Sequence, residues 1–211
     1  GSLIKFKIDN SELNFEHVYL LSKSSDNIKI SCQNLEVTPS LLRNFSAPVI
    51  LKTDLDIKDY LHILQFDDDG FNKWDAVQNL YLNSYFNKKN IVAINSLLRD
   101  LLSKKSINLS LLSFILDLPS RNAFENFLNI SDPIEVFIKR KELMTTIGFE
   151  LQNIFEIKAL ELYDYKIEAD ISVGERSLLG KILNYLVLIN NKVGLDLAKK
   201  ITLSKNMTLS I

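Results

Sequence analysis

The chain has 211 residues, of which 46% are hydrophobic and 24% are charged, so it can bury a sizeable core and does not have the composition of a disordered protein. Its 25 basic and 26 acidic residues leave a formal net charge of −1, which gives no electrostatic reason to expect nucleic acid or an anionic membrane as a partner. Only 6 glycines and 4 prolines are present, which favours long regular elements, and helices over strands.

Residues 1–53 follow the alternating pattern of β-strands, in which apolar and polar side chains lie on opposite faces. Ile4, Phe6 and Ile8 alternate with two lysines, and apolar runs that predict further strands follow at 17–21, 28–30 and 49–51. Three or four strands are too few to close a barrel. We therefore predict that this region is part of an immunoglobulin-like β-sandwich, whose edges a neighbouring segment must cover.

From residue 54 onward the apolar residues recur at helical spacing. Pro133 and Glu135 mark the clearest start, because proline suits the first helical position and a glutamate at the third completes a capping box with Asp132. We predict a mainly α-helical protein in which 54–211 form an incomplete, solenoid-like domain of stacked helix pairs. The predicted helices are one after Asp56, one after Ser120, one of about 25 residues after Asp132, and those at 72–86, 91–102, 110–116, 175–188 and 192–201.

The sequence contains no recognisable set of metal ligands, so we predict no catalytic, cofactor-binding or metal-binding residue. A zinc peptidase needs two histidines one helical turn apart with a glutamate beside the first, and neither His17 nor His62 lies in such a pattern. The run from Asp67 to Gly70 resembles part of a calcium loop, but consecutive acids point in different directions, so a solvated turn is predicted. Cys32, the single cysteine, is predicted to be a half-buried small hydrophobe in a strand.

Other functional motifs are also missing from the sequence. It has no G-x-S-x-G, no glycine-rich phosphate loop and no apolar run of the ~20 residues that a membrane span needs. The basic clusters at 104–105 and 139–141 are predicted to be solvated helix faces, so no nucleic-acid or membrane partner is expected. Asp164, Glu168 and Asp170 could serve an unrelated enzyme only in a shared pocket, and we predict that they lie in a polar connection between helices.

Two segments have residue orders too specific to be explained by composition alone. Residues Thr38–Val49 (T-P-S-L-L-R-N-F-S-A-P-V) resemble the P-S-L-L-R-x-F-S-A-P-V run of bacterial zinc aminopeptidases of the aminopeptidase N family. Residues Asp68–Gln78 (D-D-G-F-N-K-W-D-A-V-Q) are similar to the D-x-F-x-R-W-D/E-A-x-Q run that opens the helical C-terminal domain in that family. Shorter matches are L-P-S at 118–120, D-P-I at 132–134 and N-M-T at 206–208.

The resemblance implies the β-sandwich and the first part of the helical domain of such an enzyme, whose zinc motif and catalytic domain precede this region. It implies a non-catalytic chain that acts as a scaffold and as a gate over the active site in the cytoplasm. The implied partners are the catalytic domain of the same polypeptide, which would hold the zinc, and the peptide substrate. Arg43 is expected in an ion pair and Trp74 in packing, while Lys73 stands where the family usually has arginine, so any ion pair there is expected to be weaker.

The alternative is an independent helical-repeat module that binds a peptide or protein and has no enzymatic activity. It would share ancestry with the family but not its function. In either case a helical stack that ends early exposes the face that further helices would cover. We therefore expect an apolar surface near the last helix, and self-association that covers it.

Overall fold

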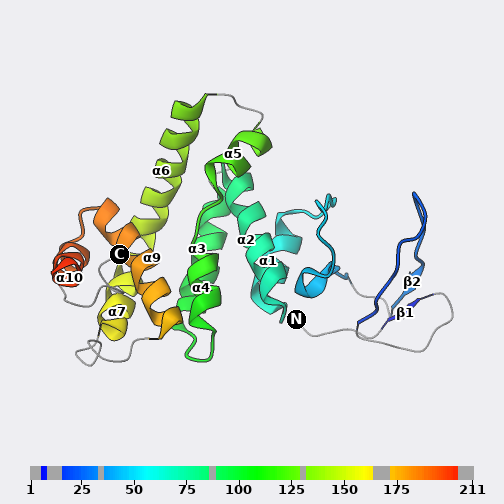
Figure 1. Ribbon diagram of the computed structural model, residues 1–211, viewed down its shortest axis with the longest axis horizontal. Coiled ribbons are helices and arrows are strands. Elements are labelled where there is room, and N and C mark those ends of the chain that lie inside the picture. Colours follow the sequence, from blue (N-terminus) through cyan, green and yellow to red (C-terminus); the bar gives the residue numbers. More distant parts are fainter. Residues whose placement is uncertain are drawn as a thin grey trace. The chain divides into compact units, whose positions relative to one another are not determined.

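The computed structural model describes residues 6–8, 16–32, 36–85, 89–128, 132–163 and 172–203 (Figure 1). The chain divides into two compact units, residues 1–40 and residues 41–211. Most of the regular structure is helical and lies in the second unit, which confirms the prediction of a mainly α-helical protein.

The described part of the first unit contains one antiparallel ladder. Strand β1 (Lys7–Ile8) pairs with strand β2 (Ile30–Ser31), and Ile8 lies opposite Ile30. The strand predicted at 28–30 is therefore confirmed only at its end. Two strands of two residues each do not make the two packed sheets of a sandwich, so a β-sandwich is not seen in the described residues of this unit.

Two further predictions for the first unit are wrong. The apolar run at 17–21 forms no strand, and the side chains of Val18 and Leu20 are 90% and 84% exposed. Cys32 is exposed rather than half-buried. A buried strand needs a hydrogen-bonded neighbour and a covering layer. Among the described residues the run at 17–21 has no strand paired with it, and Cys32, although it directly follows β2, has no layer that covers its side chain.

The second unit begins with a single 3₁₀ turn, η1 (Arg43–Phe45), and continues as a series of packed helices (Figure 1). The predicted helices other than the one of about 25 residues are confirmed, and most of their ends shift by only a residue or two. The run at 49–51, predicted as a strand, has no regular structure. The helices are α1 (Ile57–Phe66), α2 (Gly70–Ser84), α3 (Lys89–Ser103), α4 (Leu109–Ile115), α5 (Arg121–Leu128), α6 (Pro133–Glu150), α7 (Gln152–Leu162), α9 (Val173–Leu188) and α10 (Lys192–Thr202).

Side-chain caps determine where two of these helices begin. At α1, Asp56 accepts hydrogen bonds from the backbone N–H groups of Lys58 (2.7 Å) and Asp59 (3.1 Å), and the Asp59 carboxylate accepts from the Asp56 N–H (3.0 Å). Ser172 and Glu175 form the same capping box at α9. The hydrogen bonds from Ser172 hold the pKa of Glu175 below its usual value. Both helices therefore begin with a capping box, and at α1 an aspartate takes the place of the usual glutamate.

The start of α6 differs from its prediction in one detail. Asp132 caps the helix as predicted, because its carboxylate accepts from the Ile134 N–H (2.8 Å). Glu135, predicted to complete a capping box, instead accepts a hydrogen bond from the Tyr85 hydroxyl (3.2 Å). This contact ties the start of α6 to the end of α2.

The prediction of one helix of about 25 residues is wrong, because the helix breaks at Leu151 (φ −103°, ψ 7°) and continues as α7. One turn before the break, Gly148 lies so close to α9 that an added Cβ would be 3.0 Å from Cγ2 of Ile189. At the break, Nη2 of Arg99 donates to the carbonyl of Glu150 (2.9 Å). The bend lets α7 also pack against α9, which a straight continuation of α6 would not do.

The apolar stripe predicted along this helix is buried only in its second half. Ile147 and Phe155 are 0% exposed, whereas Ile134 and Phe137 are 68% and 63% exposed. The second half belongs to the main core, and Val136 lies in a smaller cluster with Leu82 and Phe124. The spacing of the apolar residues therefore predicted the apolar face of the helix, but not how much of that face other elements bury.

Two buried tyrosines connect the main core to the end of α4. The Tyr81 hydroxyl donates to the carbonyl of Ile115 (3.0 Å), and the Tyr185 hydroxyl donates to the carbonyl of Leu116 (2.7 Å). Carbonyls at a helix C-terminus have no partner within the helix. The two hydroxyls therefore satisfy buried acceptors that would otherwise destabilise the core.

We expect Tyr185→Phe to flatten the loss of stability at alkaline pH. Burial raises the pKa of both Tyr185 and Tyr81 in the folded protein above the unfolded value of about 10. Their stabilising contribution is therefore complete below about pH 10 and is lost as the pH rises above it. In urea titrations between about pH 8 and about pH 11, the free energy of unfolding should fall less steeply in the variant, by up to about 1.4 kcal/mol per pH unit. Equal slopes in the two proteins would contradict this expectation.

Candidate functional site

An arginine joins the two segments that resemble the aminopeptidase N family. Nη1 of Arg43, in η1, lies 2.9 Å from Oδ1 of Asp67, and Nη2 lies 2.6 Å from Oδ1 of Asp68. Both aspartates belong to the loop between α1 and α2. The side chain of Asp67 is 4% exposed and that of Arg43 is 18% exposed, so the first pair is largely removed from water. The ion pair predicted for Arg43 is confirmed, and we call it the Arg43 clamp.

The third aspartate of this loop fastens the backbone on both sides. Oδ2 of Asp69 accepts a hydrogen bond from the N–H of Asn44 (2.8 Å), and Oδ1 accepts from the N–H of Asn72 (2.8 Å), which caps α2. Oδ1 of Asp67 accepts from the N–H of Asp69 (2.8 Å). The solvated turn predicted here is wrong for Asp67 and Asp69, because their oxygens are used by an arginine and by backbone donors.

The segment that the clamp holds has a strained backbone. Leu42, Asn44 and Phe45 have φ angles of 52°, 55° and 53°, the left-handed region that favours glycine. For a leucine or a phenylalanine this conformation costs of order 1–2 kcal/mol. The ion pairs and hydrogen bonds from the acidic loop offset that cost, and they fix the direction in which the chain enters the helical unit.

A row of aromatic rings runs from η1 onto α2. The ring centroid of Phe45 lies 5.1 Å from that of Phe71, and the centroid of Phe71 lies 5.7 Å from that of Trp74. All three rings pack at the tilted angles that aromatic pairs favour. Trp74 is partly buried, in agreement with its predicted role in packing.

Lys73 has a different role from the one predicted for it. Its Nζ donates to the carbonyl of Leu64 (2.9 Å) and lies 3.5 Å from the carbonyl of Gln65, so it serves the C-terminal end of α1. Within the described part of the chain, no ion pair joins its ammonium to a carboxylate, so the expectation that an ion pair here would be weaker has no pair to apply to. Burial lowers the pKa of Lys73, and repulsion from Lys104 lowers it further.

The pKa values of two acids in the second segment, exposed Asp68 and half-buried Asp75, shift in opposite directions. The hydrogen bond from Arg43 holds the pKa of Asp68 below its usual value. Burial raises the pKa of Asp75, whose Oδ2 has the side-chain amide of Asn79 at 3.3 Å. The junction therefore fixes backbone positions by charge and hydrogen bonding.

The absence of a metal site from this chain stays a prediction. His17 and His62 are exposed, and the ring of His62 packs 4.8 Å from that of Phe66. Across the residues that the structure describes, no group of three or more His, Cys, Asp or Glu side chains could hold a metal ion. The carboxylates predicted in a polar connection, at 164, 168 and 170, and the N-M-T run lie outside the described residues.

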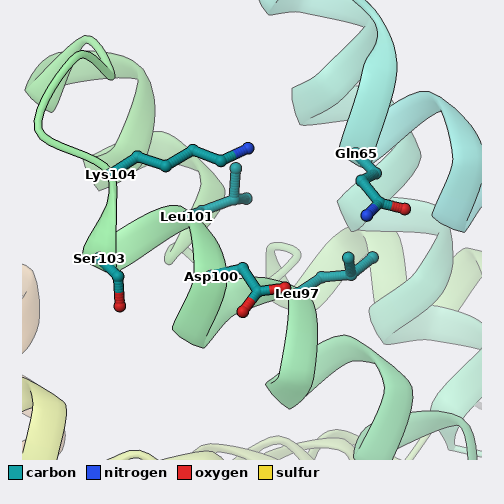
Figure 2. Close-up of a pocket in the computed structure, with 6 residues that line it drawn as sticks. All are labelled: Gln65, Leu97, Asp100, Leu101, Ser103 and Lys104. Carbon is teal, nitrogen blue, oxygen red and sulfur yellow. The ribbon is translucent and has the colours of Figure 1, made fainter. Parts of the chain in front are cut away.

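Sequence analysis missed a small pocket between α1 and α3 (Figure 2). It has a volume of about 340 Å³ and is lined by Gln65, Leu97, Asp100, Leu101, Ser103 and Lys104. Most of these residues recur at three- and four-residue spacing along α3, which places them on one helix face. The mixture of apolar, acidic and basic residues on that face was the signal that could have indicated the pocket.

The comparisons with known proteins agree on the type of chain. The family described as "Domain of unknown function (DUF3458_C) ARM repeats" matches residues 57–211. Aminopeptidase N of Escherichia coli (strain K12) is 29% identical over 163 residues, which are 70% of this chain and 18% of that protein. Aminopeptidase N of Haemophilus influenzae is 28% identical over 177 residues, 77% of this chain and 20% of that protein. The chain thus spans about a fifth of the length of these relatives.

A solved structure also has the same fold. The structure of Legionella pneumophila aminopeptidase A in complex with aspartic acid matches with a TM-score of 0.66 and 23% identity, over 88% of this chain and 25% of that one. In the part of the chain that the structure describes, no helix is long and apolar enough to cross a membrane. The resemblance stated from the sequence is confirmed by these relatives.

Proposed function

Because this chain belongs to the DUF3458_C family of ARM repeats, we propose that it is a non-catalytic part of a longer zinc-dependent aminopeptidase, in which it acts as a scaffold and a gate. The relatives at 29% and 28% identity are both named aminopeptidase N, and this chain corresponds to about a fifth of each. The Arg43 clamp carries the scaffold role. It joins the two segments that resemble the aminopeptidase N family, and its buried ion pair holds one strained turn of backbone in place.

The zinc of this proposal is held outside the chain. Two exposed histidines that lie in different units, without a cluster of further ligands among the described residues, do not fit a zinc site. We place the metal in a preceding catalytic domain of the same polypeptide, which is then the main partner of this chain. Peptides that reach that domain are the substrate class, and the cytoplasm is the proposed location.

The β-sandwich remains part of the proposal. Val49, Ile50 and Leu51 are 59%, 91% and 45% exposed, although they are three large apolar residues in a row. Such a run has the composition of a strand that lacks a partner. We propose that residues 1–53 complete a sandwich when further strands of the longer polypeptide pair with them.

On its own, the chain has an apolar surface that a second copy could cover. On α7, Ile157 and Leu160 are 57% and 52% exposed, and Leu203, just after α10, is 84% exposed. Helices α7 and α10 contact each other, so these side chains lie on neighbouring elements. Self-association through this face is part of the proposal, and a strictly monomeric mass in light scattering at every concentration would contradict it.

The proposed function is tested by an aminopeptidase assay on the purified chain, with alanyl and leucyl amides, with and without zinc. We expect no hydrolysis above that of a protein-free control containing the same zinc, because no described residues can hold the metal. Zinc-dependent release of the amine would overturn the proposal. The gate is tested in the longer polypeptide: removal of residues 57–203 should raise hydrolysis of long peptides relative to aminoacyl amides.

A further inference from the structure

The pocket between α1 and α3 offers polar groups that the protein itself does not use. Figure 2 shows the side chains of Lys104 and Gln65 on opposite sides of the pocket, with the Lys104 ammonium extending across it. Both side chains are exposed, and within the described part of the chain no side-chain hydrogen bond or ion pair joins either of them to another residue. The Lys104 ammonium donates, and the Gln65 amide donates through its nitrogen, so an acceptor placed between them would receive a hydrogen bond from each.

The local charge favours a negatively charged acceptor at that position. The Lys73 ammonium lies close enough to Lys104 for repulsion between the two cations to lower the pKa of Lys73. Lys73 is occupied by the carbonyls of Leu64 and Gln65, so it contributes charge rather than a free donor. A carboxylate beside Lys104 would relieve this repulsion.

A bare anion would nevertheless fit poorly, because the pocket also contains a carboxylate. Asp100 lies on α3, four residues before Lys104, which directly follows that helix, and no ion pair joins the two side chains within the described part of the chain. Between them, Leu97 and Leu101 supply an apolar wall, and Leu101 is only 3% exposed. The Ser103 hydroxyl already donates to the carbonyl of Arg99 (2.8 Å) and offers little to a ligand.

We propose that this pocket binds a short peptide with free ends and an apolar side chain. The peptide carboxylate accepts from Lys104 and Gln65, its terminal ammonium donates to Asp100, and its apolar side chain packs against Leu97 and Leu101. A volume of about 340 Å³ lies at the small end of ligand pockets, which suits a peptide of two residues. The pocket belongs to the helical unit alone, so its ligand does not depend on the scaffold role.

The ligand is tested by titrating leucyl-leucine into the isotope-labelled full chain and following the amide signals by NMR. We expect saturable shifts at Gln65, Leu97 and Leu101. N-acetyl-leucyl-leucine and leucyl-leucine amide should each bind about threefold more weakly, because each loses one exposed charge pair. Shifts that do not saturate, or three equal affinities, would overturn the proposal.

Charge-neutral variants assign each end of the peptide to its partner. Asp100→Asn should abolish the preference for the free over the acetylated amine, and Lys104→Gln should abolish the preference for the free carboxylate over the amide. The matched controls Asp196→Asn and Lys200→Gln remove exposed charges on α10, a helix that contributes no residue to the pocket, and should keep both preferences. If the controls lose the preferences as well, net charge and not the pocket is responsible. Because binding is measured on the chain alone, the result of the aminopeptidase assay does not affect it.

Discussion

Replacing Gly194 by alanine is expected to lower the free energy of unfolding by about 3 kcal/mol, as measured by urea titration. Gly194 is buried in the first turn of α10, where that helix crosses α9. An added Cβ would lie 2.3 Å from Cβ of Leu186 and 3.3 Å from its carbonyl carbon. Leu186 is 0% exposed, and part of the obstruction is backbone, so no side-chain rotation can relieve the overlap.

The close approach of α9 and α10 also supports a local hydrogen bond that the variant would disturb. The N–H of Gly194 donates to Oδ1 of Asn191 (3.0 Å), the N-cap of α10. Moving the helix away to admit a methyl group would lengthen this bond and uncover the Leu186 side chain. Both effects have the same sign, so the loss exceeds that of ordinary overpacking at a helix surface.

Gly180→Ala is the matched control within the neighbouring helix. Gly180 lies inside α9, and nothing would lie within 4 Å of its added Cβ. Alanine is the better helix former, so this variant is expected to gain about 0.5–1 kcal/mol. Opposite signs for the two Gly→Ala changes are the expected result. A gain or no change at Gly194 would show that the two helices are not packed as closely as described.

The helices of the second unit could be predicted because their evidence is local. Asp56 and Ser172 begin helices through bonds to residues two or three positions ahead, and the spacing of the apolar residues that follow is helical. The break at Leu151 could not be predicted in this way. It depends on how closely Gly148 approaches Ile189 on another helix, and sequence spacing carries no record of that distance.

The strands show the same limit more severely. Alternation marks a segment that would fit a sheet, but a strand forms only when another segment pairs with it. Residues 49–51 have the right composition and no regular structure, and only Ile30 and Ser31 of the third predicted strand region are paired. Composition therefore predicted which residues could pair, and not which of them do.

The candidate site was predictable in kind but not in detail. Arg43 beside an apolar segment indicated an ion pair, since a buried guanidinium needs one. Its partners, Asp67 and Asp68, lie in the loop that was predicted to be solvated. The sequence showed the charged residues but not that they pair with each other. The role of Lys73 could not be predicted. Its ammonium binds backbone carbonyls at the end of a helix, and because every residue has such a carbonyl, the sequence does not indicate which one a lysine will bind.

Replacing Arg43 by alanine is expected to lower the free energy of unfolding by about 2 kcal/mol and to release residues 41–45 from the helical unit. The substitution leaves Asp67, whose side chain is 4% exposed, without the guanidinium that pairs with it, although the hydrogen bond from the backbone N–H of Asp69 remains. It also removes the charge that offsets the left-handed backbone of Leu42 and Phe45. Urea titration measures the first effect, and the rate of chymotrypsin cleavage after Phe45 measures the second.

Two variants separate the clamp from the general loss of an arginine. Arg121→Ala breaks an exposed pair with Glu125 one helical turn away, and it should cost only about 0.3–0.5 kcal/mol without faster cleavage at Phe45. Arg43→Lys keeps the charge but reaches one aspartate instead of two, so it should give an intermediate cleavage rate. If Arg43→Ala lowers global stability but leaves cleavage at Phe45 unchanged, the arginine stabilises the loop between α1 and α2 and does not hold the incoming segment. The scaffold role would then lose the contact on which it is built.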